Sequence, residues 1–82
     1  MEKYREIIDQ IDDKLMNLLV ERLLIVKDIG LYKKKYNIPV LDLKREQLIF
    51  NKIDEKYKNI ESNQFLKSIY NKMMLETKKI QN

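Results

Sequence analysis

Apolar residues along the first 36 positions recur at alternating steps of four and three, the spacing of one face of an α-helix. Further apolar positions widen this stripe, as expected for a helix that faces a packed core. A single helix is therefore predicted from about residue 3 to about residue 36, ended by Asn37 and Pro39. It contains the one glycine of the chain, Gly30, at a cost of about 1 kcal/mol. The stripe comprises Tyr4, Ile8, Ile11, Leu15, Leu18, Ile25, Ile29, Tyr32 and Tyr36, widened by Ile7, Leu19 and Val26.

Two shorter helices are predicted in the second half of the chain. Asp42 is a good N-cap for the first of them, which keeps helical spacing until Asn59. The polar segment 61–63 is predicted to be a break, with Ser62 or Asn63 as the cap of the third helix. No alternating strand pattern or internal repeat is present, so an all-α fold is expected. One side of the third helix carries Leu66, Ile69, Tyr70, Met73, Met74 and Ile80.

The length of the first helix argues for a second copy of the chain. A helix of about 34 residues spans about 50 Å, whereas a compact monomer of this size is roughly 30 Å across. The shorter helices cannot cover such a rod, so its stripe is expected to pack against the same helix of another copy. We therefore expect one domain over residues 1–82 with three helices, one very long and two shorter, in an isologous homodimer with a helical core. A strained, partly exposed monomer is the alternative.

The composition excludes most kinds of catalytic chemistry. The chain has no Cys, no His, no Trp, one Gly and one Pro. Thiolate nucleophiles, Cys/His zinc sites, haem ligands, imidazole bases and glycine-rich phosphate loops are therefore ruled out. Any catalysis must use carboxylates, Lys, Arg, hydroxyls or amides. The charged start is followed by no unbroken apolar run, so neither a signal peptide nor a membrane span is predicted and a cytoplasmic protein is expected.

The basic residues are unevenly divided between lysine and arginine. The net charge of +4 comes from 17 basic and 13 acidic side chains. This excess is modest, so it favours a well-solvated small domain over a protein that binds an anionic partner. Of the basic residues, 14 are Lys and 3 are Arg, namely Arg5, Arg22 and Arg45. The three positions where a lysine-rich chain uses arginine are therefore more informative than the net charge.

Arg22 and Lys33 break the apolar pattern of the first helix. Arg22 lies on the stripe itself, where a guanidinium is costly unless it meets a core carboxylate such as Glu21 or Glu46, or a bound anion. Lys33 follows 11 residues later, so it returns to nearly the same face. The two sites are about 16 Å apart along the axis, and two long side chains can converge on one small molecule. Alternatively, Lys33 and the two lysines after it form a solvated helix end.

Arg5 lies 17 residues before Arg22, about 25 Å away along the axis and roughly 100° around the helix. One small ligand cannot contact both residues on the same helix, so a shared site requires that they come from different chains of a dimer. The alternative for Arg5 is a surface ion pair with Glu2 or Asp9.

Two further groups of polar residues lie at helix ends. The segment from Asp42 to Glu46 combines a helix cap, Arg45 and a first-turn carboxylate, so it can hold a hydroxyl group and an anion together. Thr77 and Gln81 are four residues apart beside the apolar face of the third helix, where two neutral hydrogen-bonding groups would point inward. The plainer interpretations are an ordinary capped helix and a fraying, polar C-terminus.

Taken together, these residues resemble the all-helical AroQ-type (type II) chorismate mutases. The resemblance covers nearly the whole chain, and it is carried by the order and spacing of several short segments rather than by any one of them. All three arginines fall at substrate-binding positions of that family. The segments are Arg5-(x)3-Asp9-(x)2-Asp12, Leu18-Leu19-Val20-Glu21-Arg22, Ile29-Gly30-Leu31-Tyr32-Lys33, Ile38-Pro39-Val40-Leu41-Asp42, Arg45-Glu46, Thr77 and Gln81.

The resemblance implies conversion of chorismate to prephenate, the shikimate-pathway step that leads to phenylalanine and tyrosine. It implies an intertwined helical homodimer with two shared sites, and no cofactor or metal. Neither nucleic acid nor a membrane is an expected partner. Arg22 would bind one substrate carboxylate and Arg5 of the partner subunit the other, while Arg45 would position the substrate. Thr77 would support a carboxylate; the family commonly has Ser there, and Thr keeps the hydroxyl but adds a methyl group.

The remaining candidates would act on the other polar groups of the substrate. By the resemblance, Lys33 and Gln81 would hydrogen-bond the ether oxygen of the breaking bond. Glu46 and the backbone N–H near Asp42 would receive the ring hydroxyl. A Claisen rearrangement fits the composition, because this one-step pericyclic reaction needs no nucleophile, proton transfer or cofactor. The enzyme has to hold the dianion in its reactive conformer and stabilise charge on the ether oxygen.

Two other functions remain open at this point. One is isochorismate pyruvate lyase activity on the same fold, which Glu46 would discriminate because the hydroxyl lies elsewhere on that substrate. The other is a small basic helical dimer that binds nucleic acid or a partner coiled coil. The second predicts Lys and Arg on an exposed face, whereas Arg22 lies on the apolar stripe.

Overall fold

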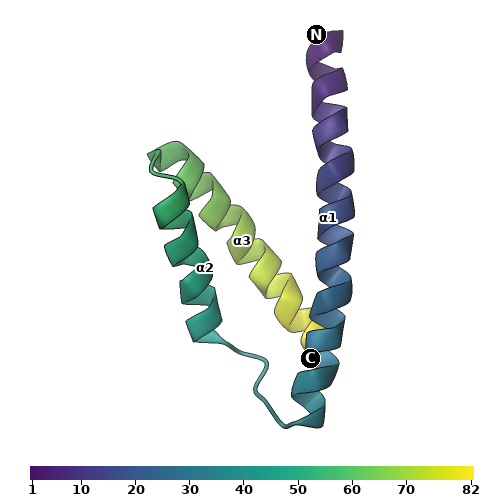
Figure 1. Ribbon diagram of the computed structural model, residues 1–82, viewed down its shortest axis with the longest axis vertical. Coiled ribbons are helices and arrows are strands. Elements are labelled where there is room, and N and C mark those ends of the chain that lie inside the picture. The colour runs from purple at the N-terminus through teal and green to yellow at the C-terminus, as the bar shows by residue number, and fades with distance from the viewer.

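The chain folds into three α-helices and no strand, as the apolar spacing predicts. In the computed structural model, which describes all 82 residues, the helices are α1 (Glu2–Lys35), α2 (Leu43–Lys56) and α3 (Ile60–Gln81). Figure 1 shows α1 as a long rod, with α2 and α3 as a shorter antiparallel pair beside it. None of the three helices has the length and hydropathy of a membrane span.

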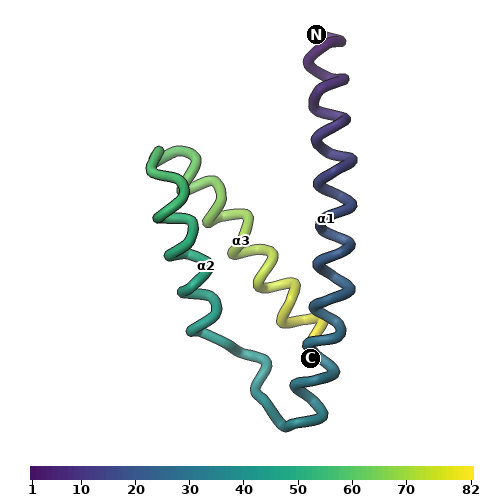
Figure 2. The backbone as a smooth tube through the Cα atoms, viewed as in Figure 1, coloured from purple at the N-terminus to yellow at the C-terminus, as the bar shows by residue number.

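The end of α1 is set by a Schellman motif rather than by proline alone. Asn37 adopts a left-handed conformation with φ 55°, which asparagine tolerates better than most residues. The backbone N–H of Ile38 then donates to the carbonyl of Lys33 at 2.8 Å, and that of Asn37 to the carbonyl of Lys34 at 3.5 Å. The predicted end near residue 36 is therefore confirmed, and the chain turns away toward α2 (Figure 2).

The boundary between α2 and α3 differs from the predicted one. α2 ends at Lys56 rather than Asn59, because Tyr57 adopts an extended conformation with φ −124° and ψ 93°. The predicted break at 61–63, with Ser62 or Asn63 as the cap, is wrong: α3 already begins at Ile60. The cap is Asn59, whose side chain accepts a hydrogen bond from the backbone N–H of Ser62 at 3.0 Å.

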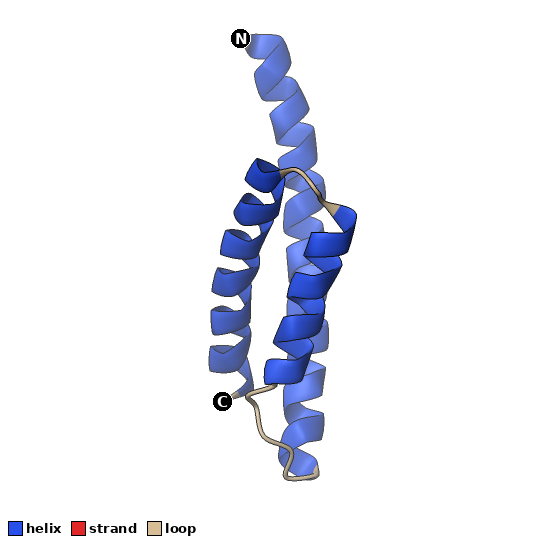
Figure 3. Cartoon of the chain, turned by 90° about the vertical axis from the view of Figure 1, so that its left-hand side faces the viewer, coloured by secondary structure: helices blue, strands red, loops and turns tan.

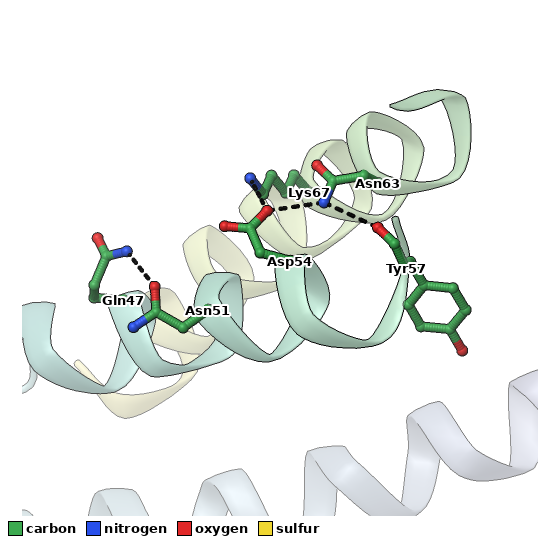
Figure 4. Close-up of polar contacts among 6 residues, drawn as sticks. All are labelled: Gln47, Asn51, Asp54, Tyr57, Asn63 and Lys67. Atoms are coloured by element: carbon green, nitrogen blue, oxygen red, sulfur yellow. Dashed lines mark hydrogen bonds and ion pairs between the residues drawn. The ribbon is translucent and has the colours of Figure 1, made fainter. Parts of the chain in front are cut away.

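Asn63 is not the cap of α3, and its side chain instead links α3 to α2 next to the turn that joins them. Its side-chain amide donates to Asp54 Oδ1 at 2.8 Å and to the carbonyl of Tyr57 at 3.3 Å (Figure 4). Lys67 Nζ lies 2.7 Å from the same Asp54 oxygen. The hydrogen bonds from Lys67 and Asn63 hold the pKa of Asp54 below its ordinary value. This cluster fixes α2 against α3 at the end far from the α1 contact.

α3 is the central helix, because it packs against both α1 and α2 while those two make no comparable contact with each other. Within the apolar side predicted for α3, Met74 is buried, Leu66, Tyr70 and Met73 are half-buried, and Ile69 and Ile80 are exposed. Only 4 of the 82 residues are buried in the single chain. They are Val26, Gly30, Ile53 and Met74.

Gly30 permits the close approach of α3 to α1. A Cβ atom added at this position would lie 3.1 Å from Cγ and 3.3 Å from Cα of Gln81. Contacts this short require Gln81 to give way by a few tenths of an ångström, so the absence of a side chain at Gly30 lets the last turn of α3 rest closely on α1. The glycine is therefore part of the helix packing, in addition to carrying the expected cost in helix propensity.

Most of the α1 stripe remains uncovered in the single chain. Tyr4, Ile8 and Ile11 are 72%, 53% and 51% exposed. Figure 1 shows the N-terminal half of α1 standing clear of the other helices, and in Figure 3 its first turns extend beyond them. The accessible surface is 7355 Å², against about 5,200 Å² for a compact monomer of this mass. The radius of gyration is 15.5 Å, against about 12 Å. The single chain is therefore less compact than an ordinary monomer of its size, and the apolar stripe of α1 is part of the surface that it leaves exposed.

Candidate active site

A cavity of about 370 Å³ lies between the three helices near the C-terminal ends of α1 and α3. This volume suits a small organic molecule. Ile25, Val26 and Ile29 of α1 supply an apolar wall, completed by residues of the 36–42 loop, α2 and α3. Of the eight candidate residues from the sequence, seven line the cavity: Arg22, Lys33, Asp42, Arg45, Glu46, Thr77 and Gln81.

Arg22 is half-buried and points across from α1 to α3. Its Nη1 donates a hydrogen bond to Thr77 Oγ1 at 3.0 Å. No ion pair joins it to Glu21 or Glu46, so the core salt bridge considered from the sequence is not formed. Because a guanidinium carries five N–H donors, Arg22 keeps donors for a bound anion while Thr77 fixes its orientation.

Lys33 and Gln81 are joined to each other and to the backbone. Lys33 Nζ donates to Gln81 Oε1 and to the carbonyl of Val40, both at 3.2 Å. Gln81 Nε2 donates to the carbonyl of Val26, also at 3.2 Å. Lys33 is thus not part of a solvated helix end, and Gln81 is fixed rather than frayed. The ammonium has three donors, so one N–H of Lys33 remains for a ligand.

The start of α2 presents a cap and a free guanidinium. Asp42 is the N-cap, as predicted, and its Oδ1 accepts a hydrogen bond from the backbone N–H of Arg45 at 3.0 Å. The Asp42 carboxylate is thereby used in holding the first turn of the helix. The Arg45 side chain is exposed and forms no ion pair within the chain, although it lines the cavity. Its charge is therefore available to a ligand.

Glu46 is the one carboxylate of the cavity that is not used as a cap. Its Oε1 lies 3.4 Å from Lys78 Nζ, while its Oε2 is buried without a hydrogen-bond partner. A buried acceptor without a donor is costly, so Oε2 is suited to a donor from a bound molecule.

Sequence reasoning missed Lys78, which lines the cavity beside Thr77. The available signal was its spacing: Lys78 lies four residues after Met74, the buried residue of α3, and therefore on the same face.

The charge of the cavity is predominantly positive. Four cationic and two anionic side chains line it, and both anions are already engaged within the chain. The cations converge from three helices, so the site favours a small molecule with negative groups at different ends. No group of three or more His, Cys, Asp or Glu side chains is placed to hold a metal ion.

Arg5 is the candidate that the single chain does not bring to the cavity. It lies on the exposed first turns of α1, at the opposite end of the helix from Lys33. It forms no ion pair with Glu2 or Asp9, so the surface pairing considered from the sequence is not formed.

Comparison with known proteins gives a consistent family. The sequence-family model of type II chorismate mutases matches residues 4–82 of this chain. A chorismate mutase of Methanocaldococcus jannaschii is 37% identical over 68 residues, which cover 77% of this chain and 69% of that protein. A bifunctional chorismate mutase/prephenate dehydratase of Aquifex aeolicus is 42% identical over 53 residues, which cover 65% of this chain and only 15% of that protein. No solved structure matches the chain significantly.

Proposed function

The chain belongs to the type II chorismate mutase family and is a chorismate mutase, and from this premise we propose how its cavity works. The cavity converts chorismate to prephenate, toward phenylalanine and tyrosine, by a Claisen rearrangement. In one cyclic shift of electrons the ether C–O bond breaks and a C–C bond forms, so no covalent intermediate and no proton transfer to the protein is needed. The supporting observation is that four cationic side chains and one unpartnered carboxylate oxygen meet in a single cavity.

The arginines hold the substrate in its compact conformer. Arg22, oriented by Thr77 at 3.0 Å, binds one carboxylate with its remaining donors. Arg45 is exposed at the edge of the cavity and positions the dianion from the α2 side. A planar guanidinium fixes the orientation of a carboxylate through paired hydrogen bonds, which a lysine cannot do. Restricting a flexible dianion in this way removes an entropic part of the barrier.

Lys33 and Gln81 act on the ether oxygen, where negative charge grows as the bond opens. Lys33 keeps one N–H donor after its contacts with Val40 and Gln81. The amide of Gln81 likewise has a second N–H beyond the one bonded to Val26. Glu46 Oε2 accepts a hydrogen bond from the ring hydroxyl, and a backbone N–H near Asp42 donates one to the hydroxyl oxygen. Fixed donors in a sheltered site stabilise the transition state more than the substrate.

The active protein is an intertwined homodimer in which Arg5 of the partner subunit completes each cavity. Support comes from the uncovered stripe of α1 and from the accessible surface of 7355 Å². This exceeds the surface of a compact monomer by about 2,000 Å², in the range that obligate dimer interfaces bury. It comes also from Arg5, which has no partner in its own chain and lies too far along α1 to reach its own cavity.

The direct test is to incubate the purified protein with chorismate and measure prephenate. We expect a rate enhancement that corresponds to about 8 kcal/mol, the lower end of enzymatic catalysis, because the reaction needs only orientation and electrostatic stabilisation. Isochorismate serves as the matched control substrate, since it carries its hydroxyl at another ring position. Consumption of isochorismate without consumption of chorismate would overturn the proposal in favour of a lyase.

A second prediction concerns the placement of Gln81. Gly30→Ala is expected to lower kcat about tenfold, because the added Cβ pushes Gln81 aside by a few tenths of an ångström and misaligns its amide. The free energy of unfolding should change by less than about 1 kcal/mol, because the better helix propensity of alanine offsets the crowding. Steady-state kinetics and thermal unfolding measure the two effects. In a Gln81→Ala background the same substitution should cost little more; a further tenfold loss there would assign Gly30 another role.

A further inference from the structure

The partner of Glu46 is a lysine to which no role has been assigned. We propose that Lys78 is a positioning residue, which acts through Glu46 to place the acceptor of the substrate's ring hydroxyl. The inference rests on the proposed function and extends it to the residue that sets recognition of the hydroxyl position.

The geometry of the pair supports this role. Glu46 lies in the first turn of α2 and Lys78 in the last turn of α3, so the ion pair closes one side of the cavity. The side chains are 22% and 32% exposed, which makes this the most sheltered ion pair of the chain. Lys78 Nζ lies 3.4 Å from Oε1, and Oε2 is the one buried side-chain nitrogen or oxygen atom without a hydrogen-bond partner. A carboxylate held at one oxygen presents the other in a fixed direction.

The neighbouring ion pairs of α3 do not share these properties. Lys79 lies 3.1 Å from Glu76, and Lys72 lies 3.2 Å from the same carboxylate. All three side chains are more than half exposed. The hydrogen bonds from Lys79, the larger cause, and from Lys72 hold the pKa of Glu76 below its ordinary value. Exposed ion pairs of this kind contribute little to folding stability, and none of the three residues lines the main cavity. Lys79 is therefore a matched control, with the same charge one position along the same helix.

The kinetic signature follows from the chemistry of the hydroxyl group. The hydroxyl takes no part in bond breaking or bond making, so its contact with Glu46 is similar in the substrate and in the transition state. Loss of such a contact raises KM and leaves kcat nearly unchanged. Loss of a contact to the ether oxygen would instead lower kcat. The two parameters therefore distinguish a residue that acts through Glu46 from one that acts on the reacting atoms.

The test compares three single variants with chorismate as substrate. Lys78→Met is expected to raise KM about tenfold with kcat within about twofold, the effect of one charge-assisted hydrogen bond. Lys78→Arg should restore KM to within about threefold, because a guanidinium can reach the same oxygen. Lys79→Met should leave both parameters unchanged. An unchanged KM in Lys78→Met, or an equal loss in Lys79→Met, would overturn the proposal.

A double variant separates positioning from simple attraction of the dianion. If Lys78 acts through Glu46, then Glu46→Gln and the pair Glu46→Gln/Lys78→Met should have the same KM within about twofold. An additional tenfold rise in the double variant would show that Lys78 attracts the substrate directly, and the proposal would fail. A wild-type protein without activity on chorismate would instead refute the proposed function, so the two failures are distinguishable.

Discussion

Lys33→Met is expected to lower kcat for the conversion of chorismate by about 10²- to 10³-fold, with a much smaller change in KM. The substitution removes one preformed hydrogen-bond donor to the ether oxygen, on which negative charge develops only in the transition state. Lys33 suits this role because Gln81 and Val40 fix its ammonium at 3.2 Å each, so its third N–H has a defined direction. Steady-state kinetics with chorismate measure the effect.

The control for this experiment is Lys34→Met, since Lys34 follows directly in the sequence and is exposed. It should leave kcat within about twofold of the wild type, because it removes the same charge away from the cavity. Circular dichroism should show that both variants keep their helices. A decrease in kcat of less than tenfold for Lys33→Met, with folding intact, would mean that Lys33 does not contact the ether oxygen.

Arg5→Ala and Arg22→Ala chains, each almost inactive alone, are expected to regain activity when mixed. Each substitution removes a carboxylate contact and should lower kcat/KM by at least about 10³-fold. In a mixed dimer, the cavity of the Arg5→Ala chain keeps its own Arg22 and receives Arg5 of the partner subunit. After random exchange half of the dimers are mixed and each has one intact site, so about a quarter of the wild-type activity should return.

The matched control is a mixture of Arg22→Ala and Arg45→Ala chains. Both of these residues line the cavity of their own chain, so no mixed dimer contains an intact site and activity should stay low. Subunit exchange must be verified, for example by mass measurement on chains of two lengths. Exchange without recovery in the first mixture would refute the shared site, as would equal recovery in both mixtures.

Helix content was predictable because it depends on local spacing. The stripe of α1 and the cap at Asp42 each follow from residues close together in the chain, and both appear in the structure. The boundary after α2 was predicted wrongly, since three polar residues in a row offered several possible caps. In the structure, Asn59 accepts the capping hydrogen bond from the backbone N–H of Ser62, and Asn63 donates a hydrogen bond to Asp54 of α2. That choice depends on how α2 and α3 pack.

The candidate site was predictable as a set of residues, although its internal contacts were not. Arg22 stood out because it interrupts an apolar stripe, and Lys33 because it shares that face. The sequence suggested carboxylate partners for Arg22, yet the structure pairs it with Thr77, 55 positions away. Lys78 was passed over as one of many lysines, because its distinction is its contact with Glu46, 32 positions away.

By itself, then, the sequence determined the three helices, the excess of α1 over what the shorter helices can cover, and the restriction of any chemistry to charge and hydrogen bonding. These properties follow from periodicity, length and composition, which are present before the chain folds. Only the tertiary structure decided which donors are occupied and which remain free: Gly30 admits Gln81, Thr77 orients Arg22, and Lys78 leaves one oxygen of Glu46 unpartnered. The physical reason is that these contacts join residues of different helices, and their distances are set by how the helices pack rather than by spacing along the chain.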